Sequence, residues 1–281
     1  MKTKIEKINK FLDFIIHSNI YLSLGAASIA YTCMVLLQVN FRWEPLIIAF
    51  CSTFFLYNLN RKTDIKEDII NYPERIEFFE RYGNKIFRIA LVLYLLSLLT
   101  ALLNNILTLG IILLPLIFVV VYSVFRLKRI ILIKNVFVGM GWATISLLVI
   151  SYSNSYNTLA LIIVTLFIFL RVLMGSAIFD VKDIKGDKIY KISTIPEKYG
   201  IKKLKYFSAI INTIAGLIIF YFSFIEILPP QGFLVFLITF YSYFVILLID
   251  KKDIKFISNI LVDGDGHVMA ILSLIGKIIW Q

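Results

Sequence analysis

The sequence predicts an all-α, polytopic membrane protein with about nine transmembrane helices. Apolar residues make up 59% of the chain and the mean hydropathy is +0.86, whereas soluble domains have roughly 45 to 50% apolar residues. A spanning helix needs about 20 mostly apolar residues, and such stretches follow one another along the chain. Because these stretches leave no segment long enough for a soluble domain, residues 1–281 are expected to form a single transmembrane domain.

The expected spans are separated by short polar turns or by two longer charged loops. They cover residues 14–38, 43–60, 86–103, 106–125, 132–153, 157–179, 206–225, 231–249 and 258–279. The first lacks the small-residue cleavage site of a signal peptide, so we expect it to stay in the protein. Cys33 and Cys51 both fall inside spans, which favours buried packing over a disulfide.

The basic residues predict how the spans are oriented. The net charge is +11, and 26 of the 29 Lys and Arg residues lie in alternate connections: Lys2–Lys10, Arg61–Arg88, Arg126–Lys134, Lys182–Lys205 and Lys251–Lys255. Basic loops stay in the cytoplasm, so the N-terminus is expected inside and the C-terminus outside. Orientation explains the charge, and no nucleic-acid partner is needed.

Two acidic clusters begin the two long cytoplasmic loops. Their members recur at helical spacing: Asn60, Asp64 and Asp68 in the first, and Asp180, Asp183 and Asp187 in the second. Like charges stacked on one helix face repel each other unless a cation lies between them. Mg²⁺ suits that place because it bridges carboxylates to phosphate oxygens. We therefore expect the clusters to face each other across a cavity.

The loops themselves predict two further surface features. Apolar and acidic residues alternate after the first cluster and are broken near Pro73, which is typical of a short amphipathic helix that covers the cytoplasmic mouth. The second loop is rich in lysine, including Lys198, Lys202, Lys203 and Lys205, and these side chains are suited to anionic lipid headgroups.

The two clusters resemble the signature motifs of the UbiA superfamily of intramembrane prenyltransferases. Thr194, Pro196 and Gly200 after the second cluster also fit that family. The resemblance covers almost the whole chain and implies nine helices around a central cavity, with a side opening for the prenyl tail. It implies Mg²⁺ between the motifs, held by Asn60, Asp64, Asp68, Asp180, Asp183 and Asp187.

A third element resembles the tyrosine and lysine pair that the family carries after its fourth helix. Tyr122 matches the tyrosine, and Arg126 stands in the lysine position. The guanidinium of an arginine can still neutralise a leaving diphosphate. Lys128 or Lys134 can supply the ammonium group of the lysine that is missing at this position. Arg126, Lys128 and Lys134 are therefore the predicted catalytic groups, and the predicted diphosphate-binding set adds Arg61 and Tyr122.

Polar residues inside spans are candidates for an acceptor site, because ionisable groups at membrane depth usually face a cavity. They are His17 and Asn19 near the start of the first span and Arg171 in the sixth. The stretch from Asp263 to His267 looks like a metal site, but its glycines favour a helix-entry turn in which Asp263 or Asp265 is the cap.

The sequence therefore favours Mg²⁺-dependent transfer of a prenyl group from its diphosphate to a hydrophobic or aromatic acceptor within the bilayer. A terpene cyclase of the same fold, in which the substrate's own double bond is the nucleophile, is the alternative. A cation transporter fits less well, since transporters place charges and broken helices near mid-membrane, whereas these clusters lie at helix ends.

The predicted orientation can be tested by cysteine labelling from outside the cell. Single cysteines near Asn104 and Ser153 should react with an impermeant thiol reagent, because their connections carry no Lys or Arg. Cysteines near Lys66 and Lys188 should react only after the membrane is opened. The reverse pattern would overturn the topology.

Overall fold

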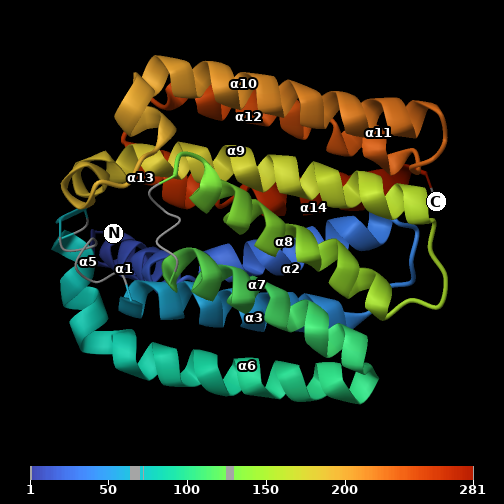
Figure 1. The fold of residues 1–281 in the computed structure, drawn as a ribbon, viewed down its shortest axis with the longest axis horizontal. Coiled ribbons are helices and arrows are strands. Elements are labelled where there is room, and N and C mark those ends of the chain that lie inside the picture. The colour runs from blue at the N-terminus through green and yellow to red at the C-terminus, as the bar shows by residue number, and fades with distance from the viewer. Residues whose placement is uncertain (1, 64–69, 72, 125–129, 281) are drawn as a thin grey trace.

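The long helices of the protein lie side by side in one bundle (Figure 1), from α10 at one edge to α6 at the other. The computed structural model describes residues 2–63, 70–71, 73–124 and 130–280. Every regular element in these ranges is helical, which confirms the predicted all-α class. Helices satisfy most backbone N–H and C=O groups internally, which suits a lipid environment.

The helices follow one another along the chain with short connections between most of them. They are α1 (Lys2–His17), α2 (Ile20–Leu36), α3 (Trp43–Thr63), α5 (Pro73–Phe78), the π-helix η1 (Phe79–Gly83), α6 (Asn84–Asn104), α7 (Ile106–Val124), α8 (Ile133–Ser151), α9 (Thr158–Tyr190), α10 (Ile195–Phe224), α11 (Gln231–Val235), α12 (Ile238–Leu248), α13 (Ile254–Phe256), the π-helix η3 (Ile257–Val262) and α14 (Asp265–Ile279). By length and composition, five helices in the described residues can cross a membrane, or six if a bent pair counts as one span. The expected count of nine is therefore not confirmed.

The start of the first expected span is broken. Its first residues belong to the end of α1, which meets α2 at an angle of 64°, and Asn19 at the junction has a left-handed backbone with φ 68°. Asparagine adopts this conformation more readily than most residues because its short side chain bonds locally. The first expected span, residues 14–38, is therefore divided at Asn19, and the two parts qualify as a membrane span only when the bent pair is taken together.

The ninth expected span, residues 258–279, is divided as well, because its first residues belong to the π-helix η3 and the α-helix α14 begins only at Asp265. The side chains of Tyr21 and Tyr241 donate hydrogen bonds to the carbonyls of Ile260 and Leu261 at 3.3 and 2.7 Å. These bonds satisfy carbonyls where the helical ladder is interrupted. The helix α5 begins at Pro73, a favoured first position; residue 72 lies outside the described residues, so the expected break stays a prediction.

The sixth expected span is the longest helix of the structure. Hydropathy placed its end at residue 179, but α9 continues to Tyr190, so the whole second acidic cluster is helical, as its spacing predicts. The C-terminal ends of α3 and α9 lie at the same end of the bundle (Figure 1), beside the N-terminus. The two clusters therefore belong to one end of the molecule.

Candidate active site

A cavity of about 220 Å³ opens between the ends of α3 and α9, and we call it the central cavity. Residues of α2, α8, α12, η3 and α14 complete its wall. Asn60 of the first cluster and Asp180 and Asp183 of the second all line it, together with Lys134 of α8. The fold thus brings described members of both clusters and a predicted diphosphate-binding lysine to one cavity.

Asp180 is fixed by two neighbours from α8. Lys134 Nζ lies 2.6 Å from one carboxylate oxygen, and Asn135 Nδ2 donates to the other at 3.0 Å. The Asp180 side chain is 1% exposed, whereas that of Lys134 is 26% exposed. The lysine ammonium therefore stabilises a buried carboxylate while part of its side chain stays open.

Asp187 is held one turn beyond Asp183 by the segment that enters α10. Its carboxylate accepts a hydrogen bond of 3.3 Å from the hydroxyl of Thr194, and it is 4% exposed. Next to it, the backbone N–H of Gly186 donates to Oδ1 of Asn71 at 2.9 Å. A Cβ at Gly186 would lie 2.5 Å from the Asn71 amide, so glycine allows the first loop to approach the second cluster.

Other predicted site residues lie elsewhere or outside the described part of the chain. Asp64, Asp68, Arg126 and Lys128 fall outside the described residues, and the Tyr122 side chain is also not described. Their predicted roles stay predictions. Arg61 is described, and it donates to the backbone carbonyl of His17, which ties the end of α3 to the end of α1.

Of the three predicted acceptor-binding residues, only Arg171 lines the central cavity. His17 lies at the end of α1, and its ring contacts Phe78 with 5.5 Å between ring centroids. Asn19 is 4% exposed at the junction of α1 and α2. Neither is among the residues that line this cavity, and their acceptor role also stays a prediction.

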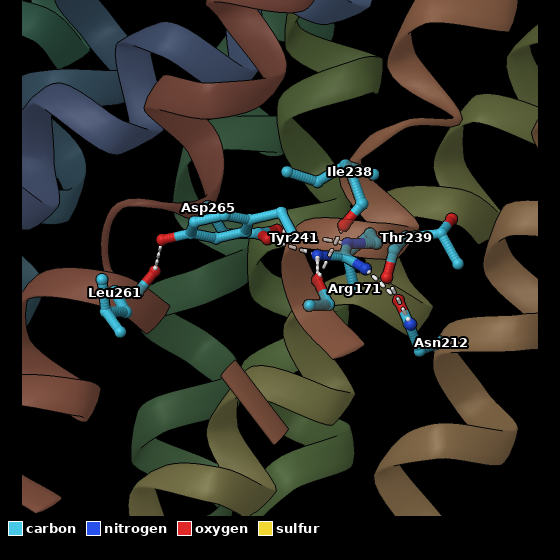
Figure 2. A network of polar contacts seen from close by, with 8 residues as sticks. Arg171, Asn212, Ile238, Thr239, Tyr241, Leu261 and Asp265 are labelled. Carbon is cyan, nitrogen blue, oxygen red and sulfur yellow. Dashed lines mark hydrogen bonds and ion pairs between the residues drawn. The ribbon is translucent and has the colours of Figure 1, made fainter. Parts of the chain in front are cut away.

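Arg171 is the centre of a buried polar network (Figure 2). It is 2% exposed and pairs with both carboxylate oxygens of Asp265. It also donates to Asn212 Oδ1 at 2.6 Å and to the Ser242 hydroxyl at 2.5 Å. Asn212 in turn donates to the carbonyl of Thr239 at 2.9 Å. One side chain of α9 thus contacts α10, α12 and α14.

The expected capping role of Asp263 or Asp265 is wrong. The residue at the cap position of α14 is Gly264, and no side chain caps this helix. Asp265 instead turns toward Arg171, because a buried guanidinium requires a carboxylate more strongly than a helix start requires a cap. His267 hydrogen-bonds Ser28 at 3.1 Å and the carbonyl of Tyr21 at 3.2 Å, so it also joins α14 to α2.

Two aromatic residues of the cavity wall were not predicted from the sequence. Tyr57 lies one turn before Asn60 on α3, and Trp142 lies on α8. The indole N–H of Trp142 donates to the Tyr57 hydroxyl at 3.1 Å, and their ring centroids are 6.2 Å apart. With 24 Phe, 15 Tyr and 3 Trp in the chain, only the three-dimensional arrangement singles this pair out.

A sequence profile of the UbiA prenyltransferase family matches residues 20–259, which contain both acidic clusters. The chain belongs to the UbiA prenyltransferase family. No curated protein sequence matches it. The multiple apolar helices together with this membership make it an integral membrane protein.

Solved UbiA structures share this fold at low sequence identity. A homologue from Archaeoglobus fulgidus bound to GPP and Mg²⁺ is 14% identical with a TM-score of 0.70, over 95% of this chain and 99% of that one. A homologue from Aeropyrum pernix K1 in its apo form is 15% identical with a TM-score of 0.68, over 92% and 97%. A digeranylgeranylglyceryl phosphate synthase is 18% identical with a TM-score of 0.62, over 96% and 99%.

The Arg171 network of this UbiA protein predicts a stability pattern. Replacing Arg171 by Met should lower the free energy of unfolding by about 3 to 5 kcal/mol, because Asp265 is left as an unpaired carboxylate. The double variant Arg171→Met/Asp265→Asn should recover part of this loss, since the unpaired charge is gone. Thermal unfolding in detergent measures both changes.

The exposed pair of Arg42 and Glu44 provides a matched control. Its atoms are 3.7 Å apart with side chains 55% and 45% exposed, so Arg42→Met should change stability by about 1 kcal/mol or less. If Arg42→Met and Arg171→Met lowered the free energy of unfolding equally, the Arg171 network would not have the stabilising role proposed for it.

Proposed function

We propose that this protein transfers a prenyl group from a prenyl diphosphate to an acceptor inside the bilayer, with Mg²⁺ as the cofactor. The observation that carries the proposal is the meeting of Asn60, Lys134, Asp180 and Asp183 around one cavity at the ends of α3 and α9. Family membership supports it, as does the Archaeoglobus relative whose structure contains GPP and Mg²⁺.

The two clusters offer the type of oxygen ligand that a magnesium ion prefers. Mg²⁺ prefers carboxylate, carbonyl, water and phosphate oxygens, and the clusters offer five carboxylates and the amide of Asn60. Within the described residues, no three His, Cys, Asp or Glu side chains gather as a metal site. The proposed set of magnesium ligands therefore includes residues of the first cluster. It consists of Asn60, Asp64, Asp68, Asp183 and Asp187.

Asp180 has a different surrounding from the other carboxylates of its cluster. Its two oxygens already contact Lys134 and Asn135, so in this arrangement it orients the lysine. Bound Mg²⁺ would neutralise charge on the leaving diphosphate. The Lys134 ammonium lies at the same cavity and supplies a second positive charge there.

The remaining steps depend on excluding water from the reacting carbon. Loss of diphosphate leaves positive charge on an allylic carbon, and aromatic ring faces attract such charge. Tyr57 and Trp142 line the cavity wall together with Asn60. These two rings are suited to shield the reacting carbon from water. Arg126, Lys128 and Tyr122 are proposed to bind the diphosphate, and this part of the proposal rests on the sequence motif alone.

The acceptor is proposed to occupy the central cavity on the side of Arg171. This part of the wall also contains Ser242 and Tyr241, whose hydroxyls can orient a polar group on an otherwise apolar molecule. A partly apolar, aromatic or lipid-like acceptor suits this mixture. The positive-inside pattern further supports a cytoplasmic position for the cavity mouth.

The central test is the substitution Asp187→Asn, with Asp64→Asn as its counterpart in the first cluster. Each change swaps a negative ligand for an amide of nearly the same shape, so turnover should fall about a hundredfold or more. Melting without Mg²⁺ should stay unchanged or rise, because one repulsion between like charges is removed. The assay incubates purified protein with labelled prenyl diphosphates and a panel of acceptors, with and without Mg²⁺.

Asp250→Asn is the matched control, because this exposed carboxylate belongs to neither cluster and pairs with Lys205 at 2.5 Å. It should retain full activity. An Asp187→Asn variant that stays active, or that loses activity only because it unfolds, would refute the assigned role. Free cyclic hydrocarbon formed without an acceptor would instead favour the cyclase.

A further inference from the structure

The charged side chains that line the central cavity are mostly acidic. Within the described part of the chain they are Lys134, Arg171, Asp180, Asp183, Asp263 and Asp265. Both cations already pair with carboxylates of this same wall. Because the aspartates outnumber the cations, the described wall carries a net negative charge.

Arg171 has little capacity left to bind an anion. A guanidinium has five N–H donors, and four of them are used: two on the carboxylate of Asp265, one on Asn212 and one on Ser242. The Arg171 side chain is 1% exposed, whereas that of Asp265 is 18% exposed. A molecule in the cavity therefore meets the carboxylate of this pair more readily than the guanidinium.

The hydroxyl groups on this part of the wall have also used their protons. The Tyr241 hydroxyl donates to the carbonyl of Leu261 at 2.7 Å (Figure 2). The Ser242 hydroxyl accepts from Arg171 and donates to the carbonyl of Ile238 at 3.0 Å. A hydroxyl has one proton to donate, so both oxygens are left as hydrogen-bond acceptors for a bound molecule.

The start of α14 adds negative charge to the same region. A helix N-terminus carries a positive partial charge that attracts anions, but Asp265 lies in the first turn of α14, and Asp263 directly before this helix also lines the cavity. Asp183 of the proposed magnesium site is roughly 18 Å from Arg171 along α9, at about 1.5 Å per residue. A metal ion at that distance does not replace the missing positive charge beside Arg171.

We propose that the acceptor is an uncharged molecule with a hydroxyl group, such as a phenol or an alcohol, and that Asp263 and Asp265 disfavour acceptors that carry a carboxylate or a phosphate. This inference rests on the proposed function. The acceptor hydroxyl donates a hydrogen bond to the Asp265 carboxylate or to the Tyr241 oxygen. An anionic acceptor would lose its hydration in the cavity and face like charges there.

The experiment compares pairs of acceptors that differ in charge and hardly in shape. They are 4-hydroxybenzamide and 4-hydroxybenzoate, 1,4-dihydroxy-2-naphthamide and 1,4-dihydroxy-2-naphthoate, and an alkylglycerol and its phosphate. Purified protein in detergent with Mg²⁺ and labelled geranyl diphosphate gives kcat/KM for each acceptor. The uncharged member of each reacting pair should have a kcat/KM about tenfold or more above that of the anion, because only the anion faces the like charges.

Two variants test whether the carboxylates cause this preference. Asp263→Asn should narrow the ratio of the two kcat/KM values about threefold or more, since one like charge is removed. Asp265→Asn leaves the Arg171 guanidinium without its carboxylate, so the anionic member should become the better acceptor. Asp250→Asn is the control and should leave the ratio unchanged, because this exposed carboxylate is not among the residues that line the cavity.

The ratio separates a role in selectivity from a role in folding, since unfolding lowers both kcat/KM values together. If Asp265→Asn fails to fold, the ratio in Asp263→Asn decides. A wild-type protein that uses the anions as well as the uncharged acceptors, or a ratio that the aspartate variants leave unchanged, would overturn the proposal while leaving the proposed function intact. Absence of prenyl transfer to every acceptor, with and without Mg²⁺, would overturn both.

Discussion

The arrangement of this protein depends on one buried charge, the guanidinium of Arg171. It lies roughly 20 Å along α9 from Thr158 at the usual helical rise, well inside the apolar part of the bundle. A charge at this depth is costly unless it is paired and hydrogen-bonded. Asp265, Asn212 and Ser242 meet that requirement from three other helices. The positions of α10, α12 and α14 relative to α9 are therefore coupled to a single residue.

This constraint reaches the candidate active site because α9 also carries the second acidic cluster. Arg171 and Asp180 lie on one helix and line the same cavity. Close packing of α14 on α2 supports this arrangement, since a Cβ at Gly266 would lie 2.6 Å from the carbonyl of Gly25. Small residues let helix backbones approach in membranes. The cavity wall near Arg171 is thus held in place by packing and by the Arg171 network.

Sequence patterns predicted the parts of this structure that depend on neighbours along the chain. Apolar stretches located most long helices, and the spacing from Asp180 to Asp187 predicted a helical cluster because residues three and four apart share a helix face. The motifs also predicted that both clusters belong to one cavity, and Asn60, Asp180 and Asp183 are the described members that line it. These features need only a local pattern or a resemblance carried by a motif.

Other features depend on contacts that no local pattern contains. The partner of Arg171 is 94 residues away, so sequence reasoning assigned Asp265 only a local role as a cap. Tyr57 and Trp142 are two among many aromatic residues, and their pairing follows from how α3 packs near α8. The break at Asn19 was also missed, because hydropathy records the apolar character of α1 and α2 and not the bend between them.

The two acidic clusters are proposed to hold a divalent metal ion together at the mouth of the central cavity. The most direct measurement is anomalous scattering from crystals grown with Mn²⁺ in place of Mg²⁺ and an unreactive prenyl thiolodiphosphate. We predict a manganese peak within coordination distance, about 2 to 2.5 Å, of oxygens from both clusters, with Asn60, Asp183 or Asp187 among them. Ordered diphosphate with no manganese peak between the clusters, or a peak held by residues elsewhere, would contradict the proposed metal site.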